Sequence, residues 1–124
     1  MEARSFLSPK TLFVSRETLL LSTRIAVLKR FGLVVFPSDL REAPTLLRDI
    51  AFDVLVLCNS LLPKEKREFI AQFKSRSPAG RVVSVSSVSS DQVEADIQLD
   101  APVTQKQWKA VCRALKTGSS LPSL

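Results

Sequence analysis

The sequence contains no histidine and only two cysteines, Cys58 and Cys112, among its 124 residues. Without histidine or a paired-cysteine motif, the usual ligands of a zinc site are missing. Two cysteines are too few for a disulfide framework, and we expect both thiols to be reduced. Only three glycines are present, which excludes the glycine-rich loop that cradles phosphates in many nucleotide-binding enzymes. These absences argue against an enzyme, and we expect no catalytic residue, metal or cofactor.

Long hydrophobic runs are missing as well. The longest run, residues 54–58, is far shorter than a membrane-spanning segment. The N-terminal sequence MEARSFLSPK has neither the apolar core nor the small-residue cleavage site of a signal peptide. We therefore expect a cytoplasmic protein without membrane attachment.

The composition is otherwise that of a folded domain. Hydrophobic residues make up 45% of the chain and charged residues 24%, far from the composition of disordered chains. A chain of this length is near the commonest domain size, so a single domain is expected. We place it at residues 11–116, between an N-terminal tail of residues 1–10 and a C-terminal tail of residues 117–124.

The net charge of +6 raises the question of nucleic-acid binding. The basic residues fall into three segments of the chain, namely Arg24, Lys29 and Arg30, then Lys64, Lys66, Arg67, Lys74 and Arg76, then Lys106, Lys109, Arg113 and Lys116. Each set lies on the polar side of a helical pattern, and no nucleic-acid recognition motif accompanies it. We interpret the sets as three solvated helix faces. Nucleic acid is an unlikely partner, because net charge alone supports that hypothesis.

Short β-rich runs alternate with helical patterns, which is typical of βαβ units around a parallel sheet. Strands are predicted at residues 12–14, 33–36, 53–58, 81–86 and 97–99, and helices at residues 16–31, 41–50, 64–77 and 105–117. The third strand is apolar on both alternating faces, as expected at the centre of a sheet that helices cover on both sides. Right-handed crossovers then favour a flavodoxin-like, doubly wound five-stranded parallel sheet of order 2-1-3-4-5.

The last predicted helix has the clearest start. Thr104 and Gln107 form a capping box, and Val103 is placed to contact Trp108. Trp108 and Cys112 fall on the apolar stripe of this helix, so we expect both in the core. The pattern also predicts a core that contains Val14, Leu55, Leu57 and Val83.

Three segments, TLFVSRE, FDVLVLCNSLLP and DIQLDAP, fall at the first, third and fifth predicted strands. In this order they resemble the receiver domain of bacterial two-component response regulators, over residues 11–116. The resemblance implies a site where acidic residues after the first strand hold magnesium and an aspartate ending the third strand accepts a phosphoryl group. A serine or threonine ends the fourth strand of such a domain, and a lysine precedes a proline after the fifth.

The residues at these positions are, in chain order, Ser15, Arg16, Glu17, Cys58, Ser86 and Ala101. Only Glu17 is acidic after the first strand, and Cys58 stands where the acceptor aspartate is expected. Ala101 replaces the lysine, so only the hydroxyl of Ser86 survives. Gln98 stands where receivers usually carry an aromatic switch residue. The resemblance therefore implies a degenerate receiver, a pseudo-receiver, whose pocket is not phosphorylated.

Two of these residues allow more than one interpretation. Arg16 could supply a fixed positive charge where a cation would sit, paired with Glu17 or Asp100, or it could be solvent-exposed. Cys58 could be a redox or ligating thiol, but we favour a small apolar residue that closes a central strand.

Residues 87–95, which link the fourth and fifth strands, are few for a parallel crossover. We therefore expect the fourth helix of a receiver to be shortened or missing. The face that receivers build from helix 4, strand 5 and helix 5 should then be partly uncovered and should not form the usual 4-5-5 dimer. A partner would meet the edge of the fifth strand, the short link, or the first helix.

Taken together, the residues predict a phosphorylation-independent, receiver-like module that binds a protein partner in bacterial signalling or transcription control. One alternative is a small-molecule or nucleotide-binding α/β domain, because the crevice at the carboxyl ends of the strands comes with this fold. Another is a basic nucleic-acid-binding protein.

Overall fold

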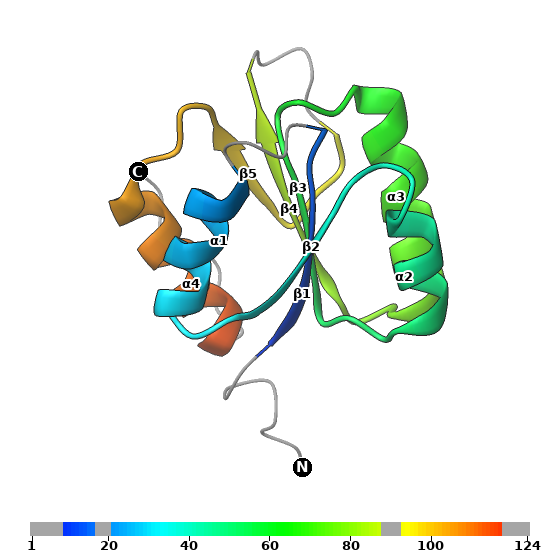
Figure 1. The fold of residues 1–124 in the computed structure, drawn as a ribbon, viewed down its shortest axis with the longest axis horizontal. Helices are drawn as coiled ribbons and strands as arrows, with labels where there is room; N and C mark the ends of the chain where they lie inside the picture. The colour runs from blue at the N-terminus through cyan, green and yellow to red at the C-terminus, as the bar shows by residue number, and fades with distance from the viewer. Residues whose placement is uncertain (1–8, 17–20, 88–92, 118–124) are drawn as a thin grey trace.

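The computed structural model describes residues 9–16, 21–87 and 93–117, and these contain five strands and four helices (Figure 1). The elements in chain order are β1 (Lys10–Val14), α1 (Leu21–Arg30), β2 (Val34–Ser38), α2 (Ala43–Asp49), β3 (Val54–Leu57), α3 (Pro63–Arg76), β4 (Arg81–Ser86), β5 (Ile97–Asp100) and α4 (Gln105–Thr117). None of the helices in these three ranges is both long enough and apolar enough to cross a bilayer.

The five strands form one parallel sheet of order β2-β1-β3-β4-β5, as predicted. All four residues of β3 are buried, which agrees with its central position and with its apolar sequence. The residues predicted for the core, Val14, Leu55, Leu57 and Val83, are each fully buried. The flavodoxin-like fold class expected from the sequence is therefore confirmed.

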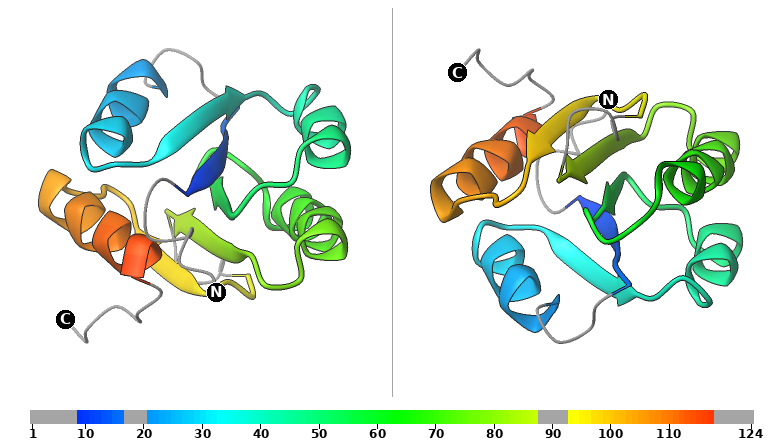
Figure 2. Two further views of the ribbon diagram at one scale, coloured as in Figure 1. Left: turned by 90° about the horizontal axis from the view of Figure 1, so that it is seen from below. Right: turned by 90° about the horizontal axis from the view of Figure 1, so that it is seen from above.

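The helices cover both faces of the sheet. Helices α1 and α4 lie side by side on one face, and α2 and α3 lie side by side on the other (Figures 1 and 2). Side chains alternate along a strand, so β3 contributes to two core layers. Val54 and Val56 lie in the layer under α1 and α4, and Leu55 and Leu57 lie in the layer under α2 and α3. Trp108 belongs to the layer under α1 and α4, where its ring lies 6.4 Å from that of Phe13.

Local signals explain several helix ends. The Thr104 hydroxyl accepts a hydrogen bond from the Gln107 N–H at 3.1 Å, and the Gln107 side chain accepts one from the Thr104 N–H at 2.8 Å, so the predicted capping box is confirmed. Pro44 lies in the first turn of α2, where a missing N–H costs no helical hydrogen bond. Gly32 follows α1 with φ of 101°, a left-handed conformation that favours glycine at a helix end.

The link between β4 and β5 contains no helix in its described part, which comprises Ser87 and residues 93–96. Its last residues are held against β4, because the Asp96 carboxylate accepts a hydrogen bond from the Val82 N–H at 2.7 Å. The described residues thus place four helices on the sheet, in agreement with the prediction of a shortened or missing fourth receiver helix. Residues 88–92 and most of the two predicted tails lie outside the described residues.

Candidate functional site

The predicted pocket lies at the carboxyl ends of β1 and β3, which are neighbours in the sheet. The residue that follows β3 is held to the end of β1 there, because the Cys58 N–H donates to the Val14 carbonyl at 3.1 Å. Ser15, which follows β1, and Cys58, which follows β3, are both buried. In an open parallel sheet this edge is where ligands usually bind.

Arg16 is held by the loop after β3 and by α3. Its guanidinium Nη2 donates to both carboxylate oxygens of Glu65, at 2.6 and 2.5 Å. Its backbone N–H donates to the Ser60 hydroxyl at 3.0 Å, and the Ser60 hydroxyl lies 3.4 Å from that of Ser15. The described partner of Arg16 is thus Glu65 rather than Asp100, while Glu17 lies outside the described residues.

Glu65 has a second role at the start of α3. Its carboxylate also accepts a hydrogen bond from the Leu62 N–H at 2.8 Å, which satisfies one of the free donors of the helix N-terminus. The hydrogen bond from Arg16, and then the one from Leu62, lower the pKa of the Glu65 carboxyl below its usual value. Glu65 therefore stays ionised and keeps the Arg16 guanidinium attached to α3.

Cys58 is fully buried, and burial raises the pKa of its thiol. The Arg24 guanidinium on α1 opposes this shift, because its Nη1 donates to the Cys58 Sγ at 3.5 Å. Burial is the larger effect, so the thiol is protonated at neutral pH. This geometry favours the interpretation of Cys58 as a small residue that closes the central strand rather than as a reactive thiol.

The other predicted positions lie at the ends of β4 and β5. The Ser86 side chain is buried, and its hydroxyl has no hydrogen-bond partner among the described residues. Ala101 is partly buried and packs against the core layer under α1 and α4. Gln98 is exposed and donates to the Val93 carbonyl at 2.8 Å, so it is tied to the link rather than inserted into the sheet.

The described side chains at these predicted positions supply no carboxylate for a magnesium ion. Magnesium prefers carboxylate and water oxygens. At the two positions after β1 the structure has the hydroxyl of Ser15 and the guanidinium of Arg16, and a second guanidinium, that of Arg24, faces the end of β3. The Arg16 charge is balanced by Glu65, and the Arg24 guanidinium repels a divalent cation. Within residues 9–16, 21–87 and 93–117, no three His, Cys, Asp or Glu side chains gather into a group that could hold a metal ion.

Lys66 was missed in the sequence, where it was assigned to a solvated face. It is only 1% exposed, and its ammonium donates to the Ser84 hydroxyl at 3.0 Å and to the Val85 carbonyl at 2.6 Å. The spacing could have revealed it, because Lys66 precedes the buried Phe69 and Phe73 by three and seven residues and so shares their stripe of α3. The interior near the site therefore contains a buried lysine that is hydrogen-bonded to β4.

A cavity of about 300 Å³ adjoins the site on the side of α1 and α4. Its walls include Arg24, Asn59, Val85 and Trp108, together with residues 101–103 of the loop after β5. Asn59 also connects the loops after β3 and β4, because its amide donates to the Ser87 hydroxyl at 3.0 Å. The structure thus has a mixed polar and apolar cavity where the fold usually binds ligands.

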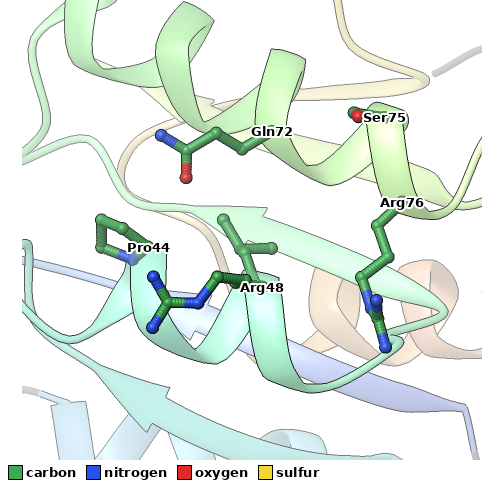
Figure 3. Close-up of a pocket in the computed structure, with 6 residues that line it drawn as sticks. Pro44, Arg48, Gln72, Ser75 and Arg76 are labelled. Carbon is green, nitrogen blue, oxygen red and sulfur yellow. The ribbon is translucent and has the colours of Figure 1, made fainter.

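A second hollow, of about 540 Å³, lies on the opposite side of the molecule between α2 and α3 (Figure 3). Pro44 and Arg48 of α2 face Gln72, Ser75 and Arg76 of α3 across it. None of the predicted site residues lines this hollow. We therefore place the candidate site at the carboxyl ends of β1 and β3.

Comparisons with known proteins agree with this arrangement of elements. No protein-family model and no curated protein matches the sequence. A response regulator receiver domain from Methylobacillus flagellatus has a TM-score of 0.74 at 14% identity, with 86% of this chain and 98% of that chain covered. A response regulator receiver protein from Sinorhizobium medicae has a TM-score of 0.74 at 20% identity, over 89% and 95% of the two chains.

A third similar structure is the receiver domain of a sensor histidine kinase from Pseudomonas aeruginosa, which has a magnesium ion coordinated in its active site cleft. It has a TM-score of 0.72 at 15% identity, over 89% of this chain and 98% of that chain. A de novo designed Rossmann 2x3 protein is also similar, with a TM-score of 0.68 at 20% identity, over 94% and 96% of the two chains. The chain therefore has the fold of CheY-like response regulator receiver domains.

Proposed function

We propose that this chain is a pseudo-receiver, a receiver-like module that binds a protein partner without being phosphorylated. The observation that carries the proposal is the charge of the pocket. Where receiver chemistry needs carboxylates, the chain has Arg16 bound to Glu65 and Arg24 facing a buried Cys58. The Arg16 charge is balanced by Glu65, and the Arg24 guanidinium supplies positive charge at the edge of the sheet where a receiver would hold a metal.

Phosphotransfer needs a carboxylate nucleophile and a metal that neutralises the phosphoryl oxygens. A protonated, buried thiol at Cys58 cannot replace that carboxylate, and Ala101 has no ammonium to stabilise the transferred group. The Ser86 hydroxyl remains, but without an acceptor carboxylate there is no bound phosphoryl group for it to contact. The pocket is therefore a structural centre that holds the loops after β1, β3 and β4 in place.

The surface that supports partner binding is the uncovered side of β5. This strand lies at the edge of the sheet, and its exposed residues, Gln98 and Asp100, point away from α4. An edge strand has backbone groups that can pair with an added strand of another chain. Glu94, in the link before β5, is exposed beside this edge. We place the partner there and expect no 4-5-5 dimer, which small-angle scattering would check.

A charge substitution at this edge tests the proposal. Glu94→Lys should weaken capture of the partner, identified by crosslinking and affinity purification, at least tenfold. The matched control is Glu68→Lys, an exposed position on α3 with the same change of charge. Equal capture by both variants would overturn the assignment of this surface. Loss of cooperative unfolding in Glu94→Lys would show that the link is structural instead.

A small-molecule site is the second candidate function, favoured by the cavity of about 300 Å³ beside the predicted pocket. A ligand with an anionic group would meet Arg24, and its apolar part would meet Trp108. A panel of nucleotides and carboxylates should then raise the melting temperature, and Arg24→Met should abolish the increase. No shift with any member of the panel would exclude those classes.

A further inference from the structure

The structure brings together two of the three sets of basic residues that are separate in the sequence. Helices α1 and α4 lie side by side on one face of the sheet (Figure 2). A groove of about 290 Å³ lies between α4 and the C-terminal end of α1. Its walls contain Arg30 of α1 and Lys109, Arg113 and Lys116 of α4. Two of the three predicted solvated faces therefore border one groove.

The cations of α4 form a regular stripe. Lys106, Lys109, Arg113 and Lys116 follow one another at spacings of three, four and three residues, which places them on one side of the helix. The stripe is about 15 Å long, because each helical residue adds about 1.5 Å. Lys116 also crosses to the end of α1, where an added Cβ on Gly32 would lie 2.9 Å from its Nζ. The groove is thus continuous between the two helices.

The two helices that carry this charge have no acidic residue of their own. Neither α1 nor α4 contains Asp or Glu, although together they carry seven Lys and Arg residues. Among the described residues, no ion pair involves Arg30, Lys109 or Lys116. Like charges at such spacings destabilise a helix, and cations near its N-terminus, such as Lys106, oppose the helix dipole. The helix dipole favours the cations of the last turns, Arg30 and Lys116, but helix stability does not explain Lys106 and Lys109.

The chemistry of the face favours phosphates over a protein surface. Protein interfaces usually have an apolar centre, and lysine is depleted from them. The large hydrophobic residues that are exposed within the described ranges are Val34 and Leu62, and neither belongs to α1 or α4. Lysine and arginine arrays without apolar anchors are instead typical of contacts to nucleic-acid phosphates.

We infer that the α1–α4 groove binds the phosphate backbone of duplex nucleic acid without reading its sequence. Over about 15 Å, duplex DNA presents about nine phosphate charges, which is enough to engage every cation of the stripe. The face has no exposed aromatic side chain on which bases of a single strand would stack, so duplex is the expected form. This surface is separate from the β5 edge proposed for the protein partner.

Fluorescence anisotropy with a labelled 20-base-pair duplex DNA tests this inference. With the four groove cations engaged, a plot of log affinity against log salt should have a slope of about −3.6, so affinity should fall about 10²-fold between 50 and 200 mM NaCl. The variant Arg30→Gln/Lys109→Gln should halve the slope. The matched control, Lys64→Gln/Arg67→Gln on the exposed side of α3, removes the same charge and should leave the slope unchanged.

Three results would overturn the inference. One is the absence of salt-dependent binding to the duplex at 50 mM NaCl. Another is an equal loss of affinity in both variants, which would mean that net charge alone attracts DNA. The third is binding of polyglutamate at the same salt with affinity equal to that for the duplex, which would assign the face to an acidic protein. The melting temperature of each variant should equal that of the parent, because all four substituted positions are exposed.

Discussion

Replacing Cys58 by aspartate restores the residue type that a receiver carries at this position, and the structure predicts how the change depends on Arg24. The Cys58 side chain is fully buried, so a carboxylate there loses its hydration, at several kcal/mol. The Arg24 Nη1 lies 3.5 Å from the Cys58 Sγ and would face the new carboxylate. We expect Cys58→Asp to be tolerated when Arg24 is present and to be strongly destabilising when it is absent.

The size of this coupling follows from the distance. Two unit charges 3.5 Å apart attract by about 5 kcal/mol at an effective dielectric constant of 20. Because Arg24 is partly exposed, solvent screening reduces this attraction to about half. The coupling energy also has an upper limit, because a buried aspartate without Arg24 can take up a proton instead of staying charged. Protonating an aspartate of ordinary pKa at pH 7 costs about 4 kcal/mol. The predicted coupling energy between the two positions is therefore about 2–4 kcal/mol.

A double-mutant cycle measures this energy. Urea unfolding of the parent, Cys58→Asp, Arg24→Met and the double variant gives the four free energies of unfolding, and methionine keeps much of the apolar stem of arginine. The coupling should shrink at pH 4, where the introduced carboxyl becomes protonated. Effects that add to within about 0.5 kcal/mol at pH 7 would refute the placement of Arg24 over the end of β3.

Three further predictions concern stability. Gly80→Ala should destabilise by about 1–3 kcal/mol, because the added Cβ would overlap the buried Phe73 ring; unchanged thermal unfolding would refute this contact. Burial raises the pKa of the Cys112 thiol from 9.0 to about 12. The contribution of the protonated thiol to the free energy of unfolding is therefore complete below pH 9 and is lost as the pH rises toward 12. Cys112→Ala should reduce that alkaline loss by about 1.4 kcal/mol per pH unit, and parallel curves for the two proteins would contradict it. The Glu65 pKa is lowered, so the Arg16–Glu65 pair stabilises above pH 4.5 and is lost on acidification; Glu65→Gln should cost less than about 1 kcal/mol at pH 7, and a difference that persists at pH 2 would count against the pair.

Much of the fold could be predicted from the sequence, because hydrophobic periodicity is a local signal. The strand Arg81–Ser86 was predicted with its observed bounds, and the capping residues of α4 were identified with their hydrogen bonds. The absence of a helix from the described part of the link agrees with the small number of residues that the link contains. These features depend on neighbours in the chain, which the sequence displays directly.

The arrangement of charges could not be predicted in the same way. Glu65 is far from Arg16 in the chain, and only the packing of α3 beside the end of β1 brings them together. Lys66 looked like a surface residue because its partners, Ser84 and the Val85 carbonyl, belong to another strand. The basic groove depends on which two helices share a face of the sheet. Such contacts are set by topology rather than by local pattern.

Intact mass spectrometry after incubation with acetyl phosphate and magnesium tests the central claim most directly. The pocket has Arg16, Arg24 and Cys58 in place of the acidic metal ligands and the acceptor aspartate of a receiver. The mass of the protein should therefore be unchanged. Magnesium alone should leave the melting temperature unchanged, while a receiver domain with the complete acidic set is phosphorylated in parallel as the positive control. A phosphate adduct on this chain, localised to residues 57–60 by fragmentation, would contradict the account.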